Sequence, residues 1–167
     1  MTLIESILLE LEQEAQTTRR VLERVSDNHL AWRPHEKART LGQLAMHVVT
    51  VPGAVAELAA SPSPAQIPNF AQEPGLKTAS ELVPALDQSV TRARHMLEGL
   101  DDADLLATWR LMRGDRELFA RPRIAFLRSV LLNHWYHHRG QLTVYLRQLD
   151  VAIPSIYGPS ADENPFA

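Results

Sequence analysis

The sequence predicts an all-α fold: a four-helix bundle with a long crossover loop and a short hairpin before the last helix. Apolar residues recur at helical spacing in four long segments, and the stretch SPSPAQIPNFAQEPG between the second and third is too rich in proline to be regular. The 167 residues are 45% hydrophobic, which is enough to bury one good core but hardly two. We therefore expect residues 1–167 to form a single domain.

The first and third segments are amphipathic. The first carries its apolar stripe over residues 4–25 and ends near Ser26–Asp27–Asn28. The third begins at Thr78, where Glu81 is placed to complete a capping box, and its stripe continues to Leu100. Both segments are long enough to span a small bundle.

The second segment begins at Thr40, and T-L-G-Q has the form of a capping box in which Gln43 reaches back to the first turn. Its apolar stripe continues to Leu58, and Pro52–Gly53 predicts a kink on the way. The fourth segment follows Pro122 and extends to Leu149. Its helical stripe includes two histidines, which the sequence therefore places on a core-facing surface.

Three connections complete the chain. The proline-rich stretch is expected to cross the domain as a loop, which fits bundle topology. The stretch TWRLMRGDRELFARP predicts a short hairpin that turns at Gly114–Asp115. The tail VAIPSIYGPSADENPFA keeps enough apolar residues to pack back on the bundle.

Composition excludes several classes of function. Seventeen Lys and Arg against 20 Asp and Glu give a net charge of -3, so the chain offers no general attraction to nucleic acid. Cysteine is absent, which leaves only nitrogen and oxygen ligands for a metal. The acidic N-terminus is unlike a signal peptide, and we recognise no membrane-spanning run. We expect a cytoplasmic protein that does not bind membranes.

Three histidines are candidates for one metal site. His134 and His138 lie four residues apart in NHWYHHRGQL, so on a helix both rings project from one face and reach a single cation. His47 stands at the border of the second segment's apolar stripe, where it can reach the bundle interior beside them. The alternative is that each imidazole is a partly buried side chain bonded to a protein group.

These residues belong to a larger pattern. LGQLAMHVV, followed much later by NHWYHHRGQLTVYLRQLDVAIPSIYGPSADE, resembles the DinB family, also called the DinB/YfiT-like metalloenzymes, over nearly the whole chain. The resemblance implies a four-helix bundle with a divalent metal held near one end by three histidines. Carried onto this sequence, those ligands are His47, His134 and His138, whereas His137 has no such role.

The resemblance also implies a function. Similar family members include thiol-dependent transferases and isomerases, in which a metal activates a low-molecular-weight thiol for attack on a small-molecule substrate. A hydrolase would need the same ligands. Zinc, nickel or iron suits such a set, as does cobalt. A non-catalytic, stress-associated protein that binds a metal or ligand is the competing hypothesis. Because family members commonly pair, we also expect a homodimer.

Other polar residues leave two interpretations open. Gln43 and Gln141 are each either a partner that orients a ligand imidazole or an ordinary capping or surface residue. Arg139 either recognises a substrate carboxylate or serves as a structural ion-pair partner. His137 flanks the site, with proton transfer as its alternative role. For Tyr157, Asp162 and Glu163 we favour a packed or solvated tail over direct participation in the site. Three further histidines are expected to be solvated: His29, His35 and His95.

Overall fold

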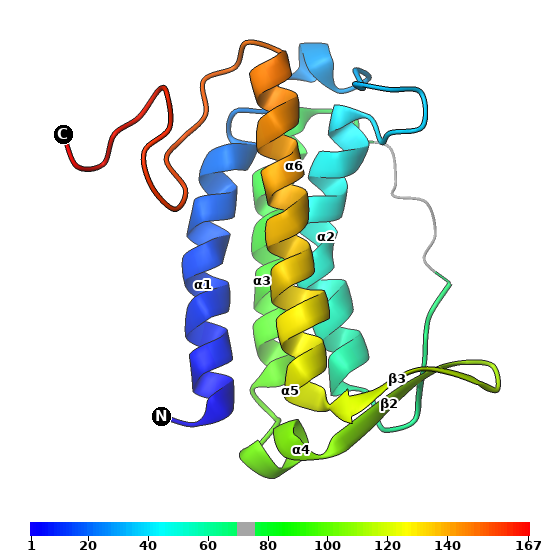
Figure 1. Cartoon of the computed structure of the whole chain (residues 1–167). Helices are drawn as coiled ribbons and strands as arrows, with labels where there is room; N and C mark the ends of the chain where they lie inside the picture. The colour runs from blue at the N-terminus through cyan, green and yellow to red at the C-terminus, as the bar shows by residue number, and fades with distance from the viewer. Residues whose placement is uncertain (70–75) are drawn as a thin grey trace.

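The computed structural model describes residues 1–69 and 76–167. Its long helices are α1 (Leu3–Leu22), α2 (Leu41–Ala60), α3 (Leu82–Leu97) and a last helix made of α5 (Arg123–Phe126), the π-helical segment η3 (Leu127–Asn133) and α6 (His134–Gln148). Its shorter elements are η1 (Asp27–His29), η2 (Ala79–Glu81), α4 (Asp102–Leu106), β1 (Ala65–Gln66), β2 (Thr108–Arg113) and β3 (Arg116–Pro122). Figure 1 shows the long helices side by side. The four predicted helices are therefore present.

The predicted start of α2 agrees with the structure. Thr40 Oγ1 accepts a hydrogen bond from the backbone N–H of Gln43 at 3.2 Å, and Gln43 Oε1 accepts from the N–H of Thr40 at 2.9 Å. At the third segment Glu81 likewise reaches back to Thr78, but a 3-10 turn precedes the α-helix. The first helix ends at Leu22, before the predicted stop at Ser26–Asp27–Asn28.

The all-α expectation is wrong in one respect, because the chain also forms a small mixed sheet of order β1-β2-β3. The predicted hairpin is present: β2 and β3 pair antiparallel around Gly114–Asp115, and Gly114 has φ +58, which glycine adopts without strain. The third strand was not predicted. β1 comes from the proline-rich crossover and pairs parallel with β2, and a strand of two residues has no alternating pattern to recognise.

The long connection between α2 and α3 is required because the two helices run in the same direction. In Figure 1 both α2 and α3 run from the top of the bundle to the bottom, so the connection between them returns along its length. The predicted loop covers residues 61–75, of which 70–75 lie outside the described residues. Within the described part, Ile67 donates its backbone N–H to the carbonyl of Met112 at 2.8 Å, which fixes this side of the crossover to the sheet.

Pro52 and Gly53 shape the contacts of α2, which continues through both residues as one helix. Proline has no N–H, so the carbonyl of Val48 lacks its usual helical donor. Trp135 of α6 supplies that donor, with Nε1 at 2.8 Å from the Val48 oxygen. Gly53 donates its N–H to Ser89 Oγ of α3 at 2.9 Å, and a Cβ here would lie 3.1 Å from Ser89. The two residues thus fix α2 against α3 and α6. The kink that we predicted at Pro52–Gly53 is not tested by these contacts.

The side chains that the last helix buries differ from those that the sequence predicted. Its buried side chains are Leu127, Leu131, Leu132, Trp135, Arg139, Leu142 and Leu146. From Leu127 to Arg139 this series advances by four residues a step, because the wider turns of a π-helix bring residue i+4 closer to the position above residue i. His134 and His138 are consequently half-buried at the border of the core. The prediction that they face the core is wrong, since regular α-helical spacing does not apply across η3.

Helix α2 is more apolar than the sequence analysis recognised when it found no membrane-spanning run. By length and composition alone, α2 could cross a bilayer: it has 20 residues and contains an 18-residue window of mean hydropathy 1.2. However, 61% of that window is buried inside the structure. A central helix of a bundle is expected to have this composition, because it is covered on most sides by other helices. The apolar character of α2 is thus accounted for by the core.

The hydrogen bond between Trp135 and Val48 gives a first prediction. Trp135→Phe leaves a buried carbonyl without a donor, which should lower the free energy of unfolding by about 1–3 kcal/mol in addition to the packing loss. In a Pro52→Ala background the new N–H can serve that carbonyl, so the same substitution should cost about 1 kcal/mol less. Urea denaturation of the four proteins measures this difference. Strictly additive effects would contradict the assignment.

Candidate metal centre

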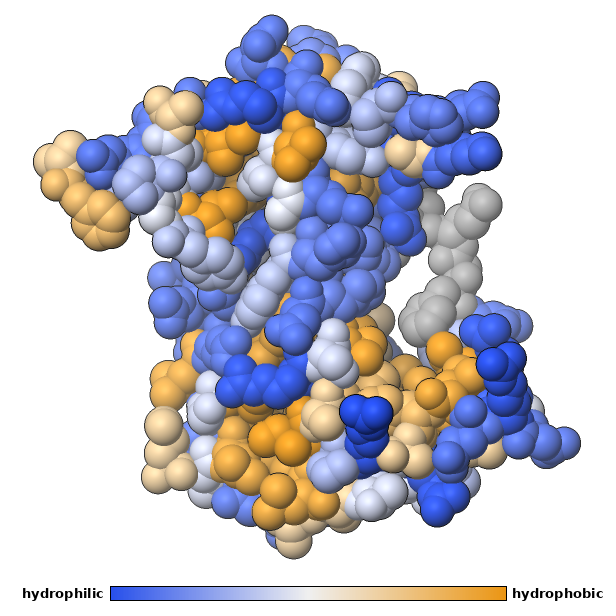
Figure 2. All heavy atoms as spheres, viewed as in Figure 1, coloured by the Kyte–Doolittle hydropathy of each residue, from blue (hydrophilic) through white to orange (hydrophobic). Residues whose placement is uncertain are grey.

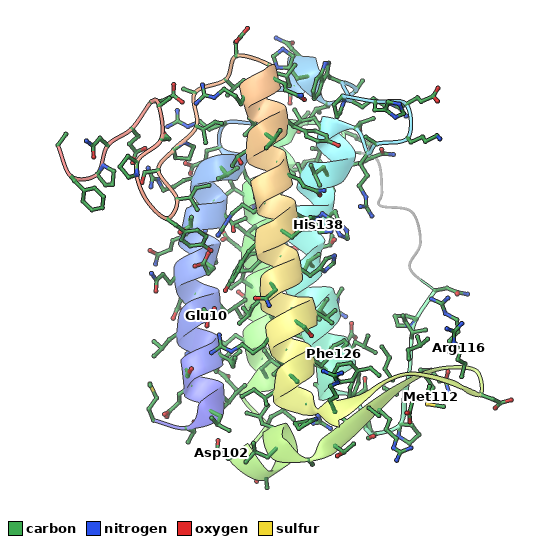
Figure 3. The ribbon with its side chains drawn as sticks, in the orientation of Figure 1. Glu10, Asp102, Met112, Arg116, Phe126 and His138 are labelled. Atoms are coloured by element: carbon green, nitrogen blue, oxygen red, sulfur yellow. The ribbon has the colours of Figure 1, made fainter. Side chains whose placement is uncertain are left out.

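The structure brings the three predicted histidines together from two helices. His47 lies on α2, and His134 and His138 lie one turn apart on α6, which Figure 3 shows in the middle of the bundle at the labelled His138. One ring nitrogen from each residue lies within 4.8 Å of those of the other two. The Nε2 atoms of His134 and His138 are 2.8 Å apart. This geometry could hold one cation, because a metal–nitrogen bond of about 2 Å requires donors this close.

The two candidate glutamines have different roles. Gln141 Oε1 lies 2.7 Å from Nδ1 of His138, and because an amide oxygen only accepts, Nδ1 must carry the hydrogen. The neutral ring then presents the lone pair of Nε2 toward His134, the state that a metal ligand requires. Gln43 is occupied by the cap of α2. The structure therefore supports an orienting role for Gln141 and the capping role for Gln43.

Burial keeps the histidine pair on α6 neutral. It lowers the pKa of His138 to about 4, against the opposing effect of the hydrogen bond to Gln141, and the imidazoles of His47 and His134 add to the decrease. Burial also lowers the pKa of His134, and His47 contributes. The Val130 carbonyl opposes that shift, although its geometry falls short of a hydrogen bond to Nδ1. Both rings are ready to bind a cation at neutral pH without first losing a proton.

The histidines border a pocket of about 1000 Å³. His47 and His134 stand in its wall, whereas His138 does not line it. The remaining walls come from the loop before α2, from α2 itself, from residues 67–69 of the crossover, from the hairpin and from the first part of the last helix. Sequence reasoning missed these residues, because the hairpin carries no chemical motif and the pocket forms only when it folds against α2.

Arg139 has a structural role. Its side chain is 2% exposed and forms an ion pair with Glu14 of α1 at 2.6 Å. It also donates to Thr18 Oγ1 at 3.2 Å, and it hydrogen-bonds the hydroxyl of Tyr157. These contacts occupy the guanidinium on the side of α6 that faces α1, so it is not placed to bind a ligand in the histidine pocket. Of its two predicted roles, the structure supports the ion-pair partner.

The C-terminal tail is fixed to the bundle by charged side chains. Glu163 pairs with Arg20 of α1 at 2.6 Å, and Asp162 pairs with Arg147 of α6. Figure 1 shows the tail descending beside α1, away from α2. This agrees with the packed tail that we favoured. His35 and His95 are exposed as predicted, whereas His29 is half-buried, so the prediction of a solvated side chain is wrong there. His137, predicted to flank the site, is exposed on α6 between His134 and His138.

The profile of the DinB family matches residues 2–165. The chain belongs to the DinB family. Its resemblance in sequence and the three-histidine cluster therefore agree, and the fold places the cluster where two helices of a DinB bundle meet.

Relatives of the chain match nearly all of its length. The uncharacterized protein YrdA of Bacillus subtilis (strain 168) is 27% identical over 169 residues, which cover 96% of this chain and 91% of YrdA. A solved DinB-like protein from Bacillus cereus ATCC 10987 is 25% identical, with a TM-score of 0.74 over 93% of this chain and 98% of that one. A DinB-family structure from Exiguobacterium sibiricum 255-15 shares the fold, at 21% identity and a TM-score of 0.65 over 97% and 98% of the two chains.

The glutamines give a second prediction. Gln141→Leu removes the acceptor that orients His138, so affinity for a divalent cation should fall by about 10–100-fold. Gln43→Leu is the matched control, because it removes a glutamine from the pocket wall without touching His138 and should change affinity far less. Isothermal titration of the chelator-treated proteins with zinc or nickel measures both. Equal losses in the two variants would remove the orienting role.

The buried histidine pair gives a third prediction, on stability against pH. A histidine of unfolded pKa about 6.5 whose pKa is lowered in the folded chain favours folding above that pH, and the contribution disappears as pH falls through the folded value. Metal-free wild type should thus lose melting temperature between pH 6.5 and about 4 more steeply than His138→Gln. His95→Gln, altered at an exposed position of α3, should retain the wild-type slope. Identical slopes for wild type and His138→Gln would refute this.

Proposed function

We propose that this protein is a divalent-metal-dependent enzyme that acts on a small molecule, with His47, His134 and His138 as the metal ligands. One observation carries the proposal: imidazoles from two helices converge in the wall of a pocket large enough for a substrate. A purely structural metal is usually enclosed by its protein ligands, whereas a catalytic one keeps a position open. Here the pocket provides access to that position.

The donor set supports activation of a thiol. A cation held by three neutral imidazoles keeps its full charge and lowers the pKa of a thiol or water that binds to it. A free thiol has a pKa of about 8.5, against about 15.7 for water, so the thiol needs the smaller shift. Among the described residues that line the pocket, Glu57 is the one carboxylate, and it pairs with Arg92 at 2.6 Å. A general base for water is therefore not evident there.

The chain's own residues would orient the ligands and limit water. Gln141 fixes the tautomer of His138, so that its lone pair points toward the shared centre. The hydrogen bond from Trp135 to Val48 sets α6 against α2 immediately beside His134 and His47. Apolar side chains of α2 and the hairpin form much of the pocket wall. An apolar wall strengthens electrostatic effects at the centre, because it excludes solvent.

We accordingly favour a thiol-dependent transferase or isomerase that uses a low-molecular-weight thiol. Hydrolysis at the same centre, and a non-catalytic protein that binds a metal or ligand, are the outcomes that the assay below must separate. Zinc, nickel and iron all accept three imidazoles. A homodimer in the cytoplasm remains our expectation, and light scattering after size exclusion measures the oligomeric state.

The fourth prediction tests the proposed function. Purified protein should contain about one divalent cation per chain, and conjugation of a small thiol to an activated aryl halide should stop after chelation and return on reloading. His134→Ala should lose at least about 100-fold of the rate, whereas His137→Ala, altered at the exposed neighbour, should retain it. Turnover without any thiol would indicate hydrolysis instead. Activity that is indifferent to chelation would refute the metal-dependent mechanism.

A further inference from the structure

The pocket beside the histidines has a cationic end. Lys37 and Arg39, from the loop before α2, both line it. Within residues 1–69 and 76–167 neither side chain forms a hydrogen bond or an ion pair with a carboxylate, and Arg39 is close enough to His134 to contribute to lowering the pKa of that imidazole. Among the described lining residues, this end carries two cationic side chains and no carboxylate, because Glu57 lies near the far end of the α2 lining, where it pairs with Arg92 at 2.6 Å.

The start of α2 adds to that charge without supplying contacts. Its N-terminus is the positive end of the helix dipole. However, its first amides are already used: Leu41 donates to the carbonyl of Trp32 at 2.8 Å, and Gly42 donates to that of Leu30 at 3.0 Å. The next amide, of Gln43, donates to Thr40. An anion bound here would therefore depend on the side chains of Lys37 and Arg39.

The other end of the pocket is mainly apolar, and the charge of Glu57 there is balanced by Arg92. Its lining follows α2 from Gln43 to Leu58, about 22 Å of helix. Near the far end it is closed by Leu111, Leu118 and Phe119 of the hairpin and by Phe126, whose ring lies 5.4 Å from that of Phe119. In Figure 2 the molecule is hollowed on this side, with hydrophilic atoms at the upper loop and hydrophobic atoms toward the hairpin. His47 stands one turn from Gln43, near the cationic end.

We propose that this pocket binds an amphiphilic carboxylate, with its anionic group at Lys37 and Arg39 and an unbranched or aryl apolar body extending along α2 to the hairpin. The inference rests on the proposed function for one detail: if the metal centre acts on this ligand, the reacting atom lies within a few bonds of the carboxylate, because the histidines are close to the cationic end. The binding itself needs no metal.

The fifth prediction concerns this binding. Chelator-treated protein is titrated by calorimetry with octanoate, decanoate and decyltrimethylammonium. Decanoate should bind about fifteenfold more tightly than octanoate, since each of its two additional buried methylenes contributes about 0.8 kcal/mol, or roughly a fourfold change. The cationic probe of equal chain length should bind much more weakly. Because the charged contacts are exposed, raising the salt concentration should weaken decanoate binding.

Two matched pairs of variants locate the ends of the ligand. Arg39→Gln should weaken decanoate about fivefold, whereas Arg24→Gln, at an exposed position after α1, should not. Leu118→Gln should remove much of the advantage of decanoate over octanoate. Its control is Leu106→Gln, on α4, which is 59% exposed and does not line the pocket, against 39% for Leu118. All four positions are at the surface, so the variants should fold.

The outcomes separate this inference from the proposed function. Equal affinity for the anionic and cationic probes, or equal effects of Arg39→Gln and Arg24→Gln, would overturn the anionic end. The absence of a chain-length effect, or equal effects of Leu118→Gln and Leu106→Gln, would overturn the apolar end. Selective decanoate binding by a protein that contains no metal and has no thiol-dependent activity would refute the enzyme while leaving the ligand class intact.

Discussion

The hydrogen bond from the indole of Trp135 to the carbonyl of Val48 is the contact on which the candidate site depends. It joins α6 to α2 at 2.8 Å, and each of its residues directly follows a histidine of the cluster. Helices packed only by aliphatic side chains can slide or rotate with modest penalty, whereas a buried polar pair has one favourable register. Because Pro52 leaves that carbonyl without a helical donor, the sequence of α2 itself creates the demand for Trp135.

Helix α6 presents polar side chains of different function on two opposite faces. On one side, α6 presents imidazoles whose neutral state is favoured by burial, next to a pocket. On the side toward α1 it buries the guanidinium of Arg139, satisfied by Glu14, Thr18 and Tyr157. Such a buried pair is costly to break, because the remaining charge has no compensation. The network therefore holds α1, α6 and the tail together. The opposite face of α6 carries the candidate metal ligands His134 and His138.

Much of this arrangement could be predicted from local patterns. The capping boxes, the hairpin turn at Gly114 and the His134–His138 spacing are short-range signals, and each was confirmed. The pairing of β1 with β2, the pocket and the position of Arg39 near His134 depend on segments far apart in the chain, for which one sequence carries no periodic signal. The facing of the last helix was mispredicted, because the hydrogen-bond pattern of η3 depends on tertiary packing rather than on the composition of LRSVLLN.

The π-helical segment has an evolutionary consequence. Its wide turns accommodate an additional residue within a helix whose two ends remain packed in the bundle. Because the wide turns take up that residue locally, a deletion of one codon between Leu127 and Asn133 should restore ordinary α-helical turns and leave the facing of His134 and His138 unchanged. The length of this segment can thus change by one residue during evolution while His47, His134 and His138 stay together.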